Sequence, residues 1–302
     1  MTLLRNPHLL LAITALLWGG NAIAGKFAVG HISPMMLTMF RWGIALAVML
    51  YIARNELKAD WPVIRKNWIY LVLMGAIGYT AFNFFLYSAL RYISVINVTL
   101  EQSAMPIIIF VINFLLYKIR VKWLQIVGYV ITVAGVVVTV SAGDPLSLFA
   151  SGGRSISQGD ILMLCAALCY GGYSVALRSK PKMHWKSFLT ALIAAAFPAA
   201  ILGAGFEAWA GDSQFPTTAQ GLLVALYAGI FPSLVSQGFF IKGVEILGAN
   251  AAGLYINMVP IFGALLAVLL LGEQLFLYHA LAFVLVVGGI TLAQRTAAKT
   301  TA

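Results

Sequence analysis

Long apolar segments recur along this sequence and restrict its fold more than any other feature. The chain has 302 residues, and stretches of roughly 20 apolar residues alternate in it with short polar breaks. A helix needs about 20 predominantly apolar residues to cross the hydrocarbon core of a bilayer. The pattern predicts ten membrane-spanning helices, at residues 8–29, 34–53, 68–90, 94–117, 121–141, 158–178, 186–209, 218–242, 249–271 and 276–294.

The composition excludes the main alternative classes. Hydrophobic residues make up 62% of the chain and charged residues 9%, whereas soluble domains average about 45–50% and about 25%. Two cysteines are too few for a disulfide scaffold, and the sparse charges form no basic face for nucleic acid. Membrane β-strands would alternate strictly, and runs such as 106–116 do not. We therefore predict an all-α polytopic membrane protein.

Basic residues are concentrated in every second break between the predicted spans. If the N-terminus is cytoplasmic, ten spans return the C-terminus to the same side. The cytoplasmic segments then hold most of the 19 Lys and Arg residues, namely Arg5, Arg54, Lys58, Arg65, Lys66, Lys118, Arg120, Lys122, Arg178, Lys180, Lys182, Lys186, Lys242, Arg295 and Lys299. Lys26, Arg91 and Arg154 remain outside, and Arg41 lies within a span. Because cytoplasmic loops are enriched in Lys and Arg, both termini are expected in the cytoplasm.

The two halves of the sequence resemble each other. Residues 15–21 align with residues 167–173, and a nearly constant spacing then pairs further positions: Lys26 with Arg178, Gly75 with Gly229, Asn83 with Gln237, Pro106 with Pro260 and Gly135 with Gly289. The longest break, rich in Gly and Ser, separates the halves. We predict a first five-helix repeat at residues 1–142, an outer-side linker at 143–157 and a second five-helix repeat at 158–302.

An odd number of spans in each repeat determines how the repeats are related. Five spans end on the opposite side from where they began, so the second repeat must enter the membrane in the opposite sense. Inverted repeats of this kind are typical of secondary transporters, in which the substrate site lies near the membrane midplane between the halves. The sequence therefore predicts two inverted five-helix repeats around a central cavity, with alternating access to that cavity.

Several motifs carry a resemblance to a known family. They are Trp18-Gly19-Gly20-Asn21, Glu101-Gln102-Ser103-Ala104-Met105-Pro106, and Pro260 followed by Leu271-Gly272-Glu273. With the five-plus-five arrangement, they resemble the drug/metabolite transporter superfamily, EamA-like branch, and most closely its bacterial aromatic amino-acid exporters. The resemblance covers nearly the whole chain and implies export of amino acids across the inner membrane. The first half differs in having Lys118-Ile119-Arg120 where the second has Gly272-Glu273-Gln274.

Polar and aromatic side chains recur on one face of several predicted spans. Polar groups inside a membrane usually face the bundle interior or a wet cavity. The candidate substrate-binding residues are Trp18, Asn21, Tyr79, Asn83, Glu101, Gln102, Ser103, Tyr170, Tyr173, Gln237, Tyr255 and Asn257. The alternative is that amides and hydroxyls join helices and aromatics mark the interfaces. An aromatic, amide-rich cavity favours an aromatic or large neutral amino acid as substrate.

Two charged residues lie deep within predicted spans. Glu101 is about seven residues into its span from the outer side, and Arg41 is about as deep in the second span. A charge at this depth is costly unless it is paired or neutralised. One hypothesis is a structural ion pair between the two residues. The other is that Glu101 binds a substrate ammonium group or carries a proton.

Two prolines occupy equivalent positions in the two repeats. Pro106 and Pro260 each remove a backbone hydrogen bond within a predicted helix. Such positions permit a bend, so both are candidate hinges for rocking of the repeats. A static kink is the alternative.

No motif indicates an enzyme, a cofactor or a metal site. HExxH and GxSxG are absent, residues 20–26 match only the first part of a P-loop, and Cys165 and Cys169 have no nearby His. We expect a monomeric multi-pass transporter that binds a small-molecule substrate and membrane lipid, with protons as a candidate coupling ion and no nucleic acid. The alternatives are transport of another solute class, such as nucleosides or drugs, an intramembrane enzyme or flippase-like protein, and a channel.

Overall fold

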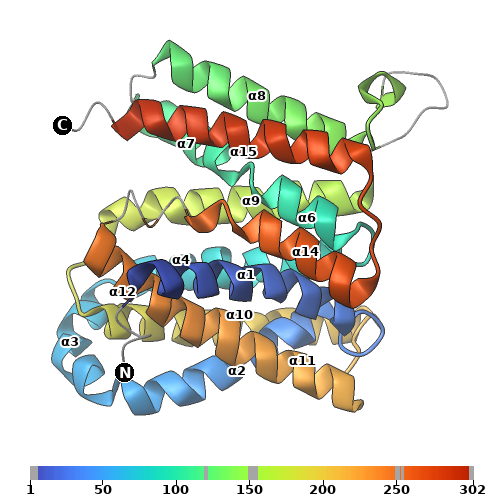
Figure 1. The fold of residues 1–302 in the computed structure, drawn as a ribbon. Helices are drawn as coiled ribbons and strands as arrows, with labels where there is room; N and C mark the ends of the chain where they lie inside the picture. The colour runs from blue at the N-terminus through green and yellow to red at the C-terminus, as the bar shows by residue number, and fades with distance from the viewer. Residues whose placement is uncertain (1–5, 119–121, 149–155, 249–251, 253–254, 299–302) are drawn as a thin grey trace.

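The structure, a computed structural model, is a bundle of helices that run roughly parallel or antiparallel to one another (Figure 1). It describes residues 6–118, 122–148, 156–248, 252 and 255–298, so parts of the predicted linker and of the predicted span at 249–271 lie outside the described residues. The elements are α1 (Pro7–Ala28), α2 (Pro34–Ile52), α3 (Arg54–Lys66), α4 (Trp68–Gly75), η2 (Ala76–Ala81), α5 (Phe82–Ala89), α6 (Val95–Gln102), α7 (Met105–Tyr117), α8 (Trp123–Val140), η3 (Pro145–Leu148), α9 (Gln158–Ala176), η4 (Leu177–Ser179), α10 (Trp185–Trp209), α11 (Ala219–Ile230), η5 (Phe231–Val235), α12 (Ser236–Leu247), α14 (Val259–Leu271) and α15 (Leu277–Ala298). No strand occurs among these residues, which confirms the all-α prediction for the described part.

Helix length and hydropathy agree with a membrane location. Eight helical segments within the described residues are long and apolar enough to cross a bilayer. Two shorter apolar helices, Val259–Leu271 and Leu277–Ala293, stand where the last two spans are predicted. Large apolar side chains are exposed on the outward faces, for example Leu202 and Leu223. Such a surface is suited to lipid rather than water.

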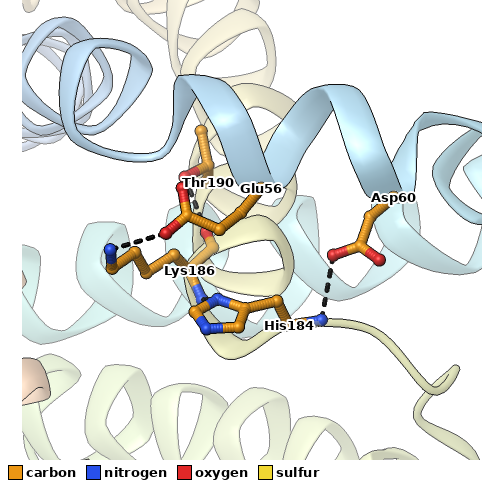
Figure 2. A network of polar contacts seen from close by, with 5 residues as sticks. All are labelled: Glu56, Asp60, His184, Lys186 and Thr190. Carbon is orange, nitrogen blue, oxygen red and sulfur yellow. Dashed lines mark hydrogen bonds and ion pairs between the residues drawn. The ribbon is translucent and has the colours of Figure 1, made fainter.

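The helix α3 was not predicted, because residues 54–67 are polar and lack the apolar run of a membrane span. Its charged residues anchor it to the start of α10 (Figure 2). Lys186 Nζ donates to Glu56 Oε1 at 2.6 Å, and the backbone N–H of His184 donates to Asp60 Oδ2 at 2.9 Å. The hydrogen bond from Lys186 is the main cause that lowers the pKa of Glu56 from 4.5. These contacts join a helix of the first half to a helix of the second.

Three irregular features recur at matching positions in the two halves. The π-helical segments η2 and η5 interrupt the third and eighth predicted spans. A helix then restarts after Ala104 in the first half and after Met258 in the second. Both restarted helices, α7 and α14, end in a left-handed residue, Lys118 and Gly272. The halves thus share local irregularities as well as apolar segments.

The prolines of the predicted hinges lie at these restarts. Pro106 and Pro260 occupy the first turns of α7 and α14, and not helix interiors as predicted. A proline is well tolerated in a first turn, because the N–H that it lacks has no intrahelical partner there. Each proline therefore follows a break in the helix.

The buried apolar residues form two clusters. We call the end of the bundle where α1 begins and α15 ends the termini end, and the opposite one the far end (Figure 1). The larger cluster fills the far end, between the second half of α1, the start of α2, α5 and α6, and includes Leu37, Leu86 and Ile96. The second cluster lies at the termini end, mainly between α2, α4, η2 and α10. The far end is consequently packed across the whole bundle.

Two carboxylates of the second half reinforce the far end. Glu207, at the end of α10, accepts hydrogen bonds from Ser33 Oγ and from the backbone N–H groups of Met35 and Met36. Glu273, after α14, accepts from the first N–H groups of α6. Both carboxylates lie at helix N-termini, where unsatisfied N–H groups and the helix dipole favour negative charge.

Helices α8 and α15 pack side by side along one edge of the bundle (Figure 1). Their backbones meet at two glycines, since a Cβ added to Gly289 would lie 2.4 Å from the carbonyl oxygen of Gly128. Small residues allow this approach, which supplies much of the packing between helices in a membrane.

We expect Gly289→Ala to destabilise the protein by about 1–3 kcal/mol, the usual cost of overpacking a well-packed contact. The adjacent residue provides the control, because nothing lies within 4 Å of a Cβ added to Gly288. Thermal unfolding of the detergent-solubilised variants measures the effect. Equal stability of Gly288→Ala and Gly289→Ala would contradict the packing described here.

Candidate functional site

A cavity of about 490 Å³ lies between the two halves of the chain. The first half contributes residues of α1, α2, η2, α5, α6, α7 and α8, and the second contributes residues of α9, η4, η5, α12 and α14. Its walls include two guanidinium groups, amides, hydroxyls and aromatic rings. A cavity of this size can hold a small organic molecule.

Most of the predicted substrate-binding residues line this cavity. The structure brings together Trp18, Asn21, Tyr79, Asn83, Gln102, Ser103, Tyr170, Gln237 and Asn257, as well as Arg41, Pro106 and Pro260. They come from segments distant in sequence but related by the repeat. The positions of polar residues within the predicted spans therefore identified much of the cavity wall.

Three predicted residues do not line the cavity. Tyr173 lies behind its wall, where its ring contacts those of Tyr79 and Tyr170 at 5.7 Å each. Tyr255 is near the start of α1, and its hydroxyl bonds His8 Nδ1. Glu101 is buried in the last turn of α6 and does not line the cavity, unlike Gln102 and Ser103. Neighbours in sequence on a helix point in different directions, so Gln102 faces the cavity while Glu101 does not.

The hypothesis of an ion pair between Arg41 and Glu101 is wrong. Arg41 is buried, with 6% of its surface exposed, and its partners are uncharged. Its Nε donates to Ser233 Oγ at 2.7 Å. Its Nη1 lies 2.9 Å from Asn21 Oδ1, 2.6 Å from Asn83 Oδ1 and 2.6 Å from the Tyr87 hydroxyl.

The π-helical segment η5 helps to position one of these partners. In a π-helix the hydrogen-bond pattern shifts by one residue, which alters the direction of the side chains that follow. Ser233 Oγ donates to the carbonyl oxygen of Ala228, five residues earlier, and accepts from Arg41. The irregular turn thus presents a hydroxyl oxygen to the buried guanidinium.

Glu101 instead contacts a second carboxyl group. Its side chain lies close to that of Asp160 near the start of α9, and its Oε1 has no hydrogen-bond partner among the described residues. Two neighbouring carboxyl groups repel each other when both are ionised, so a proton on one of them is favoured. The pair is therefore a site where a proton can reside.

Aromatic rings form one wall of the cavity. Arg41 Cζ lies 4.7 Å from the centre of the Trp42 ring, and that ring stacks on Tyr79 at 4.8 Å with an interplanar angle of 18°. Phe82 and Tyr170 continue the wall with their centroids 5.2 Å apart. The rings present flat, apolar surfaces beside a cation, which suits a ligand with a flat apolar part.

Sequence reasoning missed several lining residues. Trp42, Phe82, Phe110, Asn113, Tyr129 and Arg178 all contribute to the walls. Asn113 had a usable signal, as a lone amide in an apolar span, and its Oδ1 is a buried acceptor that finds no partner among the described residues. The aromatic residues had no such signal, because the sequence does not distinguish a ring that faces the cavity from one that faces lipid.

The cavity extends toward the termini end. It is lined by α7 as far as Asn113, by Tyr129 near the start of α8, and by Arg178 after α9. The apolar cluster containing Leu37 and Leu86 occupies the far end of the same helices. Access from the termini end is therefore favoured in this conformation.

We expect a cysteine at Asn113 to react with a membrane-impermeant maleimide from the termini end only. The background is the chain with Cys165 and Cys169 replaced by Ala, and a cysteine at the exposed Lys58 of α3 identifies the termini end in the same vesicles. A cysteine at Met163, which is 1% exposed in the far-end cluster, is the unreactive control. Labelling of Asn113→Cys from the opposite end alone would contradict this geometry.

Known proteins resemble this chain over nearly its whole length. An uncharacterized transporter of Bacillus subtilis, YyaM, is 23% identical over 95% of this chain and 93% of its own length. An uncharacterized transporter of Archaeoglobus fulgidus is 27% identical over 95% of this chain and 96% of its own. A crystal structure covers 97% of this chain and 98% of its own with a TM-score of 0.63, and at 23% identity it supports the fold alone.

The family model of the EamA-like transporters matches the chain twice, over residues 6–141 and 157–294. Together these two matches cover nearly all of the sequence. The chain therefore belongs to the EamA-like transporter family, in the drug/metabolite transporter superfamily, and is a multi-pass membrane protein.

Proposed function

We propose that this chain is a secondary active transporter of the inner membrane that exports amino acids, aromatic or large neutral, by alternating access. The cavity between the two halves is the observation that carries this proposal. It is packed shut at the far end by apolar side chains and extends toward the termini end. A transporter needs a binding site that one end of the molecule can close while the other is open.

The distribution of basic residues supports a cytoplasmic location for both termini. The termini end of the described structure carries exposed Lys and Arg residues on α3, η4 and the following loop. With the positive-inside rule, the cavity is then open to the cytoplasm, where an exported solute binds. In intact cells, the cysteine at Lys58 should react with an impermeant maleimide only after the membrane is permeabilised.

The recurrent irregularities support two inverted repeats. The π-helical segments, the helix restarts before the prolines and the left-handed ends of α7 and α14 all recur at matching positions. The family model also matches each half separately. In the proposed cycle the halves rock against each other, and the helix breaks at Pro106 and Pro260 allow α7 and α14 to bend.

The cavity walls support a substrate with an apolar ring or chain and a polar head. Trp42, Tyr79 and Tyr170 offer ring faces, while Gln102 and Gln237 offer amide groups that donate and accept hydrogen bonds. Aromatic and large neutral amino acids combine these properties.

Counterflow in proteoliposomes tests the transport function. We expect liposomes preloaded with unlabelled L-phenylalanine to accumulate external labelled L-phenylalanine transiently above its equilibrium level. A panel of other amino acids and of nucleosides, added as competitors, identifies the substrate class. Absence of flux for the whole panel would contradict the transporter proposal, and flux without saturation or counterflow would indicate a channel.

The paired carboxyl groups support proton coupling. Glu101 and Asp160 come from different halves, on α6 and α9, and lie at the packed far end. Opening of that end would change the surroundings of both groups. A shared proton could then be exchanged once in each cycle.

We expect Glu101→Gln and Asp160→Asn to lose transport driven by a pH gradient while exchange of substrate without a gradient continues. An amide cannot release the proton that the carboxyl pair shares. Asp144→Asn, an exposed carboxylate on the loop after α8, is the matched control. Full stimulation of Glu101→Gln by a pH gradient would contradict this role.

A further inference from the structure

The buried guanidinium of Arg41 lacks a counter-ion. Its hydrogen-bond partners among the described residues are Asn21, Asn83, Tyr87 and Ser233, which are all neutral. The ion pair in the described part of the chain joins Lys186 and Glu56, on the outside of the bundle. A buried charge is usually paired, because removing it from water is costly. Arg41 therefore leaves an uncompensated positive charge at the cavity wall.

One nitrogen of this guanidinium is available to a ligand. The neutral partners engage Nε and Nη1, whereas Nη2 makes no hydrogen bond to a described residue. The described residues do not enclose Nη2 completely either. Arg41 lines the cavity, so its unengaged nitrogen is the one that remains for a ligand there.

The guanidinium is held in one orientation before any ligand arrives. Its hydrogen bonds come from α1, α5 and η5, and its plane is supported by the ring of Trp42 at 4.7 Å. A side chain that is already ordered loses little conformational freedom on binding a ligand. Preorganised N–H groups of arginine are suited to a carboxylate.

We propose that Arg41 binds the carboxylate of the transported solute, so that the cavity selects solutes with a carboxylate and disfavours cations. This proposal rests on the proposed transport function and specifies its substrate class. The aromatic wall beside Arg41 then holds the apolar part of the solute against Trp42 and Tyr79. Arg178, the other cation of the wall, is exposed at the termini end, where water screens its charge.

Pairs of ligands that differ only in the carboxylate test the proposal on the unmodified protein. The probes are L-phenylalanine with L-phenylalaninamide and L-leucine with L-leucinamide, each as competitors of counterflow. Loss of a charge-assisted hydrogen bond should weaken competition by the amides about tenfold or more. Phenylethylamine, a cation without a carboxylate, should compete as weakly as the amides.

Variants of Arg41 connect the selectivity to this residue. We expect Arg41→Gln to remove the difference between acid and amide, and Arg41→Lys to retain part of it. Arg65→Gln, on the exposed face of α3, makes the same change of charge away from the cavity and should keep the full difference. Size-exclusion chromatography identifies any variant that fails to fold.

The outcomes separate this proposal from the transport function. Equal competition by acid and amide in the unmodified protein would overturn the role of Arg41 while leaving transport intact. A preserved acid–amide difference in folded Arg41→Gln would overturn it as well. Absence of counterflow for every solute would instead contradict the transport function.

Discussion

The free-energy cost of burying a charge inside an apolar bundle determines how side chains are arranged at the centre of this structure. A guanidinium in the middle of a membrane helix costs about 2.5–3.5 kcal/mol on insertion scales unless it is solvated. Here Arg41 of α2 is solvated by side chains of α1, α5 and η5. These helices belong to both halves of the chain, so the hydrogen bonds of Arg41 join the two halves at one point. The same point forms part of the wall of the cavity.

The two ends of the bundle are stabilised by different interactions. Apolar packing and two carboxylates, Glu207 and Glu273, hold the far end, and each carboxylate joins a segment of the second half to a helix N-terminus of the first. The termini end is held at its edge by the contacts of α3 with α10 and otherwise leaves room for the cavity. In the proposed cycle, the far-end contacts are the ones that must separate when the molecule opens outward.

Local sequence patterns were sufficient for the helices and for much of the cavity. Apolar length predicted the observed bounds within a few residues, as for 34–53 against Pro34–Ile52 of α2. Tyr79 and Asn83 were predicted to share a face of their span, and both line the cavity. The pattern failed for Glu101 and Tyr173, because small rotations at helix breaks and packing between neighbouring helices decide which side chains reach the cavity. It also failed for α3, whose polar residues lack the apolar run by which spans were identified.

The sequence by itself determined that this chain is helical, where its apolar helices lie and that its halves resemble each other. These properties depend on hydrophobicity and proline, which act locally along the chain. Only the tertiary structure decided that Arg41 bonds neutral groups, that Glu101 meets Asp160 and that the far end is packed shut. Those outcomes depend on which helices approach each other and at what rotation, since a charged side chain in a low-dielectric interior must find its partners among groups distant in sequence.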